Sequence, residues 1–228
     1  MDNINKFHTN GYDILTNEVP RETIDYLKSY TLELKNRMIS NPQFEKNTKP
    51  NGTGTYGRFH DMASSSPLAD DSENKKLFNV YTSQLMYEIC KFYLMREKFY
   101  LFNDQVVVKL PKEPFHFEPH KDNQFGPNGP FPNRWDLKTL NCMIVLDDIN
   151  DKNGGFKVKN RNTLQWDDLK LLQGDVLVMD GETFHQSGDN DSDLPRRVYI
   201  CHYSTEPIGK NFKRGFYFKR FYGEHSKI

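Results

Sequence analysis

Residues 174–180 read Gly-Asp-Val-Leu-Val-Met-Asp, a short apolar run enclosed by turn-forming residues. Short runs of β-branched and apolar residues with such boundaries are typical of buried strands. Three more runs of this kind follow residue 100, at residues 101–108, 142–146 and 198–201. The sequence between the runs has no helical periodicity, which argues against a parallel α/β sheet and favours antiparallel β-structure.

The first hundred residues have a different pattern. Apolar side chains recur at helical spacing over 20–38, where Pro20 and Glu22 favour the start of a helix. A second helix is expected over about 73–96, after a polar loop at 43–72. Helices followed by strands predict a mainly β fold with flanking helices, either a sandwich or a double-sheet jelly roll.

No internal repeat or linker divides the sequence, so we expect one domain over residues 1–228. Its helical N-terminal part is expected at about 18–96 and its jelly-roll core at about 100–222. A β-rich domain of 228 residues can bury a substantial core. The three cysteines are odd in number and too far apart for a CxxC motif, which fits a reducing compartment.

The charge is balanced, with 31 Lys and Arg residues against 31 Asp and Glu residues. A general nucleic-acid or membrane-surface binder has a basic excess, so we expect neither partner. The mean hydropathy is −0.81, and no apolar run approaches the roughly 20 residues of a membrane span. The sequence begins without the features of a secretory signal, so we expect a cytoplasmic protein. The peroxisome is the alternative, because Ser226-Lys227-Ile228 differs by one residue from a peroxisomal address.

The main candidate for chemistry is His120-Lys121-Asp122. On an extended strand, residues i and i+2 point to the same side, so the imidazole and the carboxylate can reach one metal ion. His185 follows the strand at 174–180 and supplies a second imidazole. Two histidines and one carboxylate form a facial triad, which binds Fe(II) and leaves coordination positions open. An exposed His and a solvated Asp in a loop are the alternative for so short a motif.

Three other features have simpler interpretations. The segment 116–118, His-Phe-Glu, repeats the His-x-acid pattern, but we do not expect it to be the metal pair. His202 is expected to be a core histidine with a hydrogen-bond partner, since buried polar groups are normally satisfied. Residues 212–222 interleave basic and aromatic side chains, which we interpret as an outer strand rather than as a site for single-stranded nucleic acid.

Arg196 follows His185 by eleven residues and begins the next apolar strand. An arginine in this position can point inward and bind a carboxylate through two parallel hydrogen bonds. A 2-oxo diacid that chelates a metal through its keto-acid end needs such a cation for its far carboxylate. Adjacent strand residues face opposite sides, so we expect Arg196 to point inward and Arg197 outward. An exposed strand end with one solvated arginine is the alternative.

Several motifs along the chain form a joint pattern. They are residues 7–15 followed by Pro20, Val108-Lys109-Leu110-Pro111, Pro119-His120-Lys121-Asp122, Leu146-Asp147-Asp148, Asn153-Gly154-Gly155, His185-Gln186-Ser187-Gly188, Asn190, Ser192 and Arg196-Arg197. Together they resemble the phytanoyl-CoA dioxygenase-like family of Fe(II)- and 2-oxoglutarate-dependent oxygenases. The resemblance covers nearly the whole chain and implies a double-stranded β-helix, the cupin-like form of the jelly roll.

The resemblance also implies the cofactors and where they bind. Fe(II) is expected on His120, Asp122 and His185. The co-substrate 2-oxoglutarate is expected on Arg196, with help from Lys109, and O2 is the oxidant. Related halogenases have a small residue in place of the carboxylate, so Asp122 favours hydroxylation, with desaturation and ring closure as alternatives.

The identity of the substrate does not transfer from the family. Its usual Pro-Gly-Ser-His element is missing, since residues 158–163 read Val-Lys-Asn-Arg-Asn-Thr. The residues that we expect near the substrate lie in loops or beside the iron motif, where binding groups are often found. Ordinary packing in the core or on the surface is the alternative for each. They are Phe115, Arg134, Trp135, Tyr56 and Arg58.

The sequence therefore predicts a dioxygenase that hydroxylates an unactivated C–H bond and releases succinate and CO2. The expected substrate is a small molecule, either an amino-acid-derived metabolite or a lipid conjugate. Two alternatives stay open: an oxygenase that modifies a protein or nucleic acid, and a non-catalytic jelly-roll module that binds a ligand or senses iron. We expect a monomer or a weak dimer.

Overall fold

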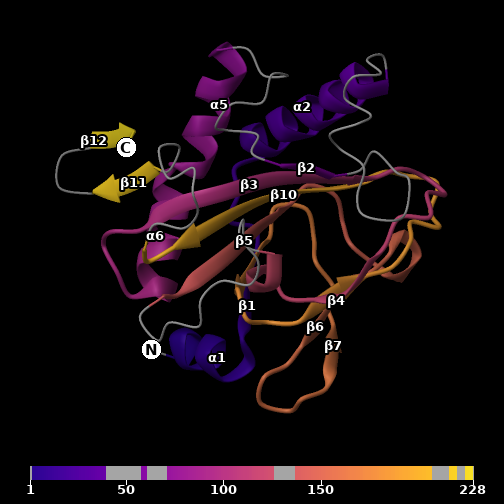
Figure 1. Cartoon of the computed structure of the whole chain (residues 1–228). Helices are drawn as coiled ribbons and strands as arrows, with labels where there is room; N and C mark the ends of the chain where they lie inside the picture. The colour runs from indigo at the N-terminus through magenta and orange to yellow at the C-terminus, as the bar shows by residue number, and fades with distance from the viewer. Residues whose placement is uncertain are drawn as a thin grey trace.

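Two antiparallel sheets form the centre of the molecule (Figure 1). The computed structural model describes residues 2–39, 58–60, 71–125, 137–206, 216–219 and 224–227. The larger sheet contains, in spatial order, β1 (Tyr12–Leu15), β8 (Val176–Asp180), β5 (Thr139–Val145), β10 (Arg196–Ser204), β3 (Tyr100–Lys109), β11 (Phe216–Lys219) and β12 (Glu224–Lys227), and β2 (Arg58–His60) pairs with β3. The smaller sheet contains β4 (Phe117–His120), β9 (His185–Ser187), β6 (Lys157–Lys159) and β7 (Trp166–Asp168).

Alternation along the strands divides the core into two layers. On β3, Val106 and Val108 pack with the helices, whereas Val107 packs toward the smaller sheet. In Figure 1, α2 and α5 lie on one side of β3 and β10, and β4, β6 and β7 lie on the other. The helices of the first layer are α1 (Asp2–Asn10), α2 (Arg21–Ile39), α5 (Asp71–Tyr81) and α6 (Gln84–Leu94). The prediction of a mainly β, jelly-roll fold with flanking helices is thus confirmed.

The long strands β3, β5, β8 and β10 form where the apolar runs predict them, but two other predictions are wrong in detail. The helix expected over 73–96 is interrupted after Tyr81. The Oγ of Ser83 accepts a hydrogen bond of 3.3 Å from the N–H of Met86 and caps a new helix, α6. The loop expected over 43–72 contains strand β2. Helix α1 was not predicted, because its nine residues are mostly polar.

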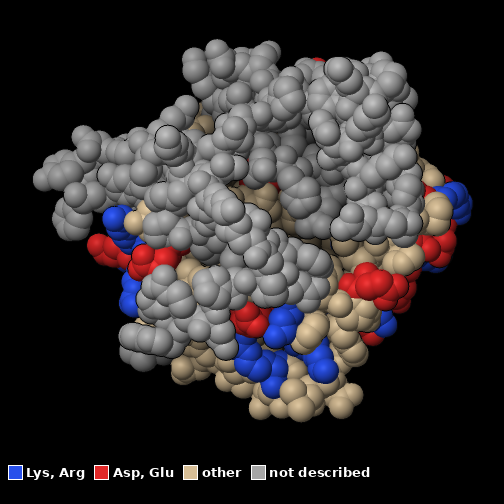
Figure 2. Space-filling view, in the orientation of Figure 1, with Lys and Arg blue, Asp and Glu red and all other residues tan. Residues whose placement is uncertain are grey.

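The C-terminal segments lie at the edge of the larger sheet. Within the run at 212–222, β11 forms a strand that pairs with β3 and β12. Ser226 and Lys227 lie in β12, and Ile228 lies outside the described residues. Across the described residues, no helix has the length and apolar character needed to cross a membrane. Figure 2 shows basic and acidic side chains interspersed on the described part of one face.

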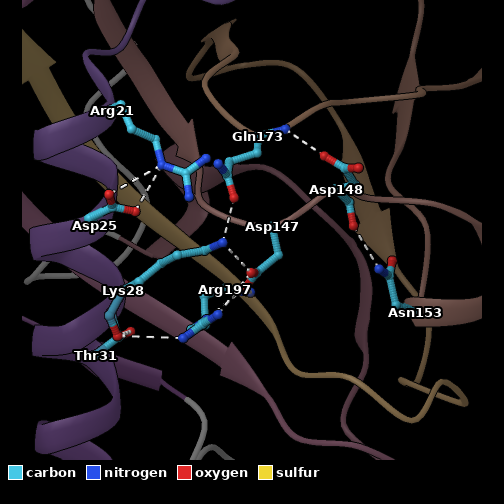
Figure 3. A network of polar contacts seen from close by, with 9 residues as sticks. All are labelled: Arg21, Asp25, Lys28, Thr31, Asp147, Asp148, Asn153, Gln173 and Arg197. Carbon is cyan, nitrogen blue, oxygen red and sulfur yellow. Dashed lines mark hydrogen bonds and ion pairs between the residues drawn. The ribbon is translucent and has the colours of Figure 1, made fainter.

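A polar network fastens α2 to the start of β10 (Figure 3). The Nε and one terminal nitrogen of Arg197 donate to the two carboxylate oxygens of Asp147 at 2.7 and 2.8 Å. The Nζ of Lys28, on α2, lies 3.0 Å from the same carboxylate. The backbone N–H of Arg197 also donates to Asp147, at 2.9 Å. Arg197 therefore has a structural partner on the helix side of the sheet, which fixes the beginning of β10.

Candidate metal centre

His120, Asp122 and His185 come together at the edge where β4 pairs with β9. His120 ends β4, His185 begins β9, and the two are directly paired in register. Their ring centroids lie 4.2 Å apart. One nitrogen of each histidine and one oxygen of Asp122 all lie within 4.8 Å of one another. Two imidazoles and one carboxylate at this separation can hold one metal ion, and this donor set suits Fe(II).

The backbone around Asp122 differs from the extended strand that the spacing of His120 and Asp122 predicts. Strand β4 ends at His120, and Asp122 begins a 3₁₀ turn, η1 (Asp122–Phe125). The expectation that both residues lie on one extended strand is therefore wrong. The turn is instead tied to the loop after β8, because the N–H of Asn123 donates to the carbonyl of Gly181 at 3.2 Å. Tertiary hydrogen bonding, rather than strand alternation, brings the carboxylate to the histidines.

Hydrogen bonds to the backbone orient both imidazoles. The Nδ1 of His120 lies 2.7 Å from the carbonyl oxygen of Glu118, and the Nδ1 of His185 lies 3.1 Å from that of Thr183. A carbonyl can only accept, so each ring donates from Nδ1, which leaves Nε2 as the nitrogen available to a metal. Neutral imidazole in this form is a metal ligand, and such backbone contacts fix the orientation of the ring.

Asp122 is held as an ionised carboxylate. Burial alone would raise its pKa, but His185, His202 and a hydrogen bond from Asn141 together lower the pKa to about 2. The Nδ2 of Asn141 donates to Oδ2 at 2.5 Å, and Oδ1 lies 3.8 Å from the Nε2 of His185. Near neutral pH the site therefore presents a negative charge to a cation.

Arg196 points into the same pocket, and Arg197 points away from it, the alternation expected of adjacent strand residues. Arg196 is 2% exposed, and its Nε has no hydrogen-bond partner within the described part of the chain. Burial lowers the pKa of this guanidinium to about 10, although nearby Asp147 opposes the shift. A buried guanidinium with an unsatisfied donor is a candidate anion site, because burying a charge is costly unless it is paired.

Lys109 lies beside this arginine and is completely buried. Its Nζ donates to the Oγ of Ser187 at 2.9 Å and to the carbonyl of Gly188. Burial, and then the charge of Arg196, lower the pKa of Lys109 to about 6. The negative charges of Asp189 and Glu113 act in the opposite direction and raise it. Two basic groups thus converge at one end of the site.

An open pocket of about 460 Å³ lies between the two sheets. The metal-binding triad and Arg196 line it, together with a wall that is mostly apolar. The remaining lining residues are Gln105, Val107, Phe117, Asn141, Met143, Phe156, Met179, Gln186, Ser187, Val198 and Ile200. One pocket therefore offers a metal site, a cation and an apolar surface.

The residues predicted to contact the substrate have different locations. Phe115 is buried in the core 5.0 Å from the ring of Phe117, and it is Phe117 that lines the pocket. Arg58 lies in β2 and is paired in register with Val107, a lining residue. The other three lie outside the described residues: Tyr56, Arg134 and Trp135.

Two other histidines considered in the sequence, His116 and His202, differ in their distance from the site. His116 interacts with Asp189 and Glu118, at 3.0 and 3.3 Å, and does not belong to the metal-binding group. His202 is buried and contacts Gln105, but it also lies 3.9 Å from Asp122. One sequence signal points to such neighbours: Asn141 is a polar residue that interrupts a largely apolar strand.

No family model matches the sequence, and no curated protein matches it in sequence. Solved structures do share its fold. AviO1 from Streptomyces viridochromogenes Tue57 is 18% identical with a TM-score of 0.70, over 91% of this chain and 96% of that one. EctD from S. alaskensis, solved with 2-oxoglutarate and 5-hydroxyectoine, is 15% identical with a TM-score of 0.69, over 92% of this chain and 78% of that one.

The epimerase SnoN is a third similar structure, solved in complex with Fe3+, alpha ketoglutarate and nogalamycin RO. It is 14% identical with a TM-score of 0.67, over 100% of this chain and 92% of that one. At these identities the likeness establishes a shared fold. The chain thus has the fold of non-heme, 2-oxoglutarate-dependent enzymes and, on that fold, a His-Asp-His group suited to a metal.

Proposed function

We propose that this chain is an Fe(II)- and 2-oxoglutarate-dependent dioxygenase of the phytanoyl-CoA dioxygenase-like family. The observation that carries the proposal is one pocket lined by both the His120–Asp122–His185 group and the buried guanidinium of Arg196. A metal site alone would fit many functions. A metal site together with a buried cation fits a co-substrate that chelates iron at one end and carries a carboxylate at the other.

The residues present fit both cofactors. The Nε2 atoms of His120 and His185 and the Oδ1 of Asp122 would hold iron. The unsatisfied Nε of Arg196 would bind the far carboxylate of 2-oxoglutarate, with Lys109 beside it. When bound, iron and 2-oxoglutarate supply the oxidising chemistry, in which O2 converts 2-oxoglutarate to succinate and CO2 and one oxygen atom reaches the substrate.

The protein's own contribution is placement and exclusion of water. Val107, Met143, Val198 and Ile200 are among the apolar side chains that line the pocket shared by the metal site and Arg196. Such a lining keeps the reacting groups away from bulk solvent. A pocket lined mostly by apolar side chains with a few polar groups is typical of small-molecule sites, which supports a small organic substrate.

We further propose hydroxylation of an unactivated C–H bond as the outcome. The presence of a carboxylate at Asp122 supports it, because the metal then has a complete facial triad. Two enzymes of the same fold are described as an epimerase and a carbocyclase, so the fold itself accommodates other outcomes. An amino-acid-derived metabolite or a lipid conjugate is the proposed class of substrate.

The test is succinate formation. The protein is loaded anaerobically with Fe(II) and 2-oxoglutarate, O2 is admitted, and succinate is measured with and without a panel of small metabolites. We expect succinate only when Fe(II), 2-oxoglutarate and O2 are all present, and faster formation with the true substrate. His120→Ala should abolish it, and His116→Ala, at a histidine outside the metal-binding group, should not. No succinate under any condition would favour the binding module.

A further inference from the structure

Asn141 is a buried polar residue with one unsatisfied side-chain atom. It lies in the middle of β5, in an otherwise largely apolar stretch, and is 2% exposed. Its Nδ2 makes one hydrogen bond, to the Oδ2 of Asp122, and within the described residues its Oδ1 has no hydrogen-bond partner. An unsatisfied buried acceptor is costly, and a native structure that retains one requires an explanation.

His202 lies directly opposite Asn141 on the neighbouring strand β10, so both side chains face the pocket side of the sheet. The Nδ1 of His202 is 3.9 Å from the same Oδ2 of Asp122. Its Nε2 lies 2.9 Å from the amide nitrogen of Gln105. An amide nitrogen only donates, so Nε2 accepts and the ring proton lies on Nδ1, toward Asp122. Two donors from adjacent strands therefore face one carboxylate oxygen.

We propose that Asn141, assisted by His202, is a positioning residue for Asp122. It holds Oδ2 of the carboxylate, so that only Oδ1 is offered to the metal. The geometry agrees, because Oδ1 is the oxygen that faces the Nε2 of His185 at 3.8 Å, whereas Oδ2 faces the two donors. This inference rests on the proposed function, since it concerns the iron site of that function.

One-oxygen coordination has a consequence for the reaction. Three protein bonds leave three positions on a six-coordinate metal, which 2-oxoglutarate and O2 together require. A carboxylate that rotates to bind through both oxygens would occupy one of these positions. The donors on Oδ2 oppose that rotation. This role explains an asparagine at a buried position where an apolar residue would leave no hydrogen-bond acceptor unsatisfied.

The test compares metal binding in variants. Asn141→Leu removes the donor and keeps a similar volume, and Asn141→Ala is the second variant if leucine prevents folding. Mn(II) in air and Fe(II) under anaerobic conditions are titrated by calorimetry. Loss of a group that orients a metal ligand typically weakens binding about 10- to 100-fold, and we expect a loss in this range. His202→Leu should show a smaller loss, because its contact is longer.

Asn160→Ala is the matched control. Asn160 is also a buried asparagine, but its amide donates to Asp167 and its Oδ1 accepts from two backbone N–H groups of its own turn. Its loss should lower the melting temperature and leave metal affinity unchanged. Wild-type metal affinity in both Asn141 variants would overturn the positioning role. Failure of the wild-type protein to bind metal, or unchanged binding in His120→Ala, would instead overturn the proposed function.

Discussion

Lys109 and Arg196 lie directly opposite each other on β3 and β10, so that two buried basic side chains form one cross-strand pair. Like charges in this arrangement destabilise a sheet. Burial lowers the pKa of both groups, and the charge of Arg196 lowers that of Lys109 further. The pKa of Lys109 is lowered to about 6 and that of Arg196 to about 10. A dianionic co-substrate bound beside them would offset both the burial of these basic groups and the repulsion between them.

The first prediction concerns this anion site. Arg196→Lys should weaken 2-oxoglutarate binding, because lysine cannot reproduce the planar, two-point contact of a guanidinium. Removing the pair outright, as in Arg196→Ala, should cost about 2–5 kcal/mol, since a desolvated carboxylate is then left without its partner. Calorimetric titration of 2-oxoglutarate into the metal-loaded protein measures the change. Arg197→Lys is the control, and a larger loss of affinity there would mean that the wrong arginine has been assigned.

The second prediction concerns Arg197 and the stability of the fold. Its side chain is 15% exposed and bonds both oxygens of Asp147 (Figure 3). Arg197→Ala should lower the free energy of unfolding by about 1–3 kcal/mol, because a part-buried carboxylate loses a charge-assisted contact. Urea denaturation checks this value. A variant as stable as the wild type would show that Lys28 alone satisfies Asp147.

The third prediction is a pH dependence of stability. The pKa of Lys109 is about 6 in the folded chain and near its ordinary value of 10.5 in the unfolded chain. Between these values the unfolded chain binds the extra proton, so this group makes the free energy of unfolding rise with pH, by at most about 1.4 kcal/mol per pH unit. Lys109→Met should remove that rise when urea denaturation is compared at two pH values inside the window.

The control for Lys109 is Lys112→Met, since Lys112 has a largely exposed side chain, 62% of its full area. It should retain the wild-type slope. A slope that is the same in wild type and Lys109→Met would show that Lys109 keeps its proton in the folded protein.

The fourth prediction concerns the turn that carries Asp122. A Cβ at Gly181 would lie 1.9 Å from the Oγ1 of Thr139 and 2.4 Å from the Oδ1 of Asn123, two atoms that hydrogen-bond each other at 2.7 Å. Gly181→Ala should therefore displace the turn, lower the free energy of unfolding by about 1–3 kcal/mol and weaken metal binding. Thermal melts and Mn(II) titration measure both effects. Gly188→Ala, where the nearest atom is 3.4 Å away, is the comparison variant, and equal behaviour of the two would remove the steric explanation.

The sequence predicts the long central strands because each is a run of apolar residues, as at residues 176–179. It does not predict α1, whose nine residues are mostly polar, or β9, whose three residues are too few to show a period. Alternation predicts the opposite directions of Arg196 and Arg197 from a local rule. The position of Asp122 depends on the hydrogen bond from the N–H of Asn123 to Gly181, which lies far away in the sequence. The spacing of His120 and Asp122 alone therefore predicts the wrong local structure.

The polar residues around the site could not be predicted from the sequence for the same reason. Asn141 and His202 meet only because β5 and β10 pair in one register. Phe117, the first residue of β4, lines the pocket, whereas Phe115 lies before that strand. Such contacts between distant segments leave no mark on local periodicity. They become visible only when the strands are assembled.

Anomalous X-ray diffraction at the iron edge tests the central claim most directly, on crystals loaded anaerobically with Fe(II) and 2-oxoglutarate. The predicted result is one iron peak bonded to the Nε2 atoms of His120 and His185 and to Asp122, with the far carboxylate of 2-oxoglutarate on Arg196. An iron peak at His116 and Glu118 instead, or 2-oxoglutarate bound away from Arg196, would contradict it.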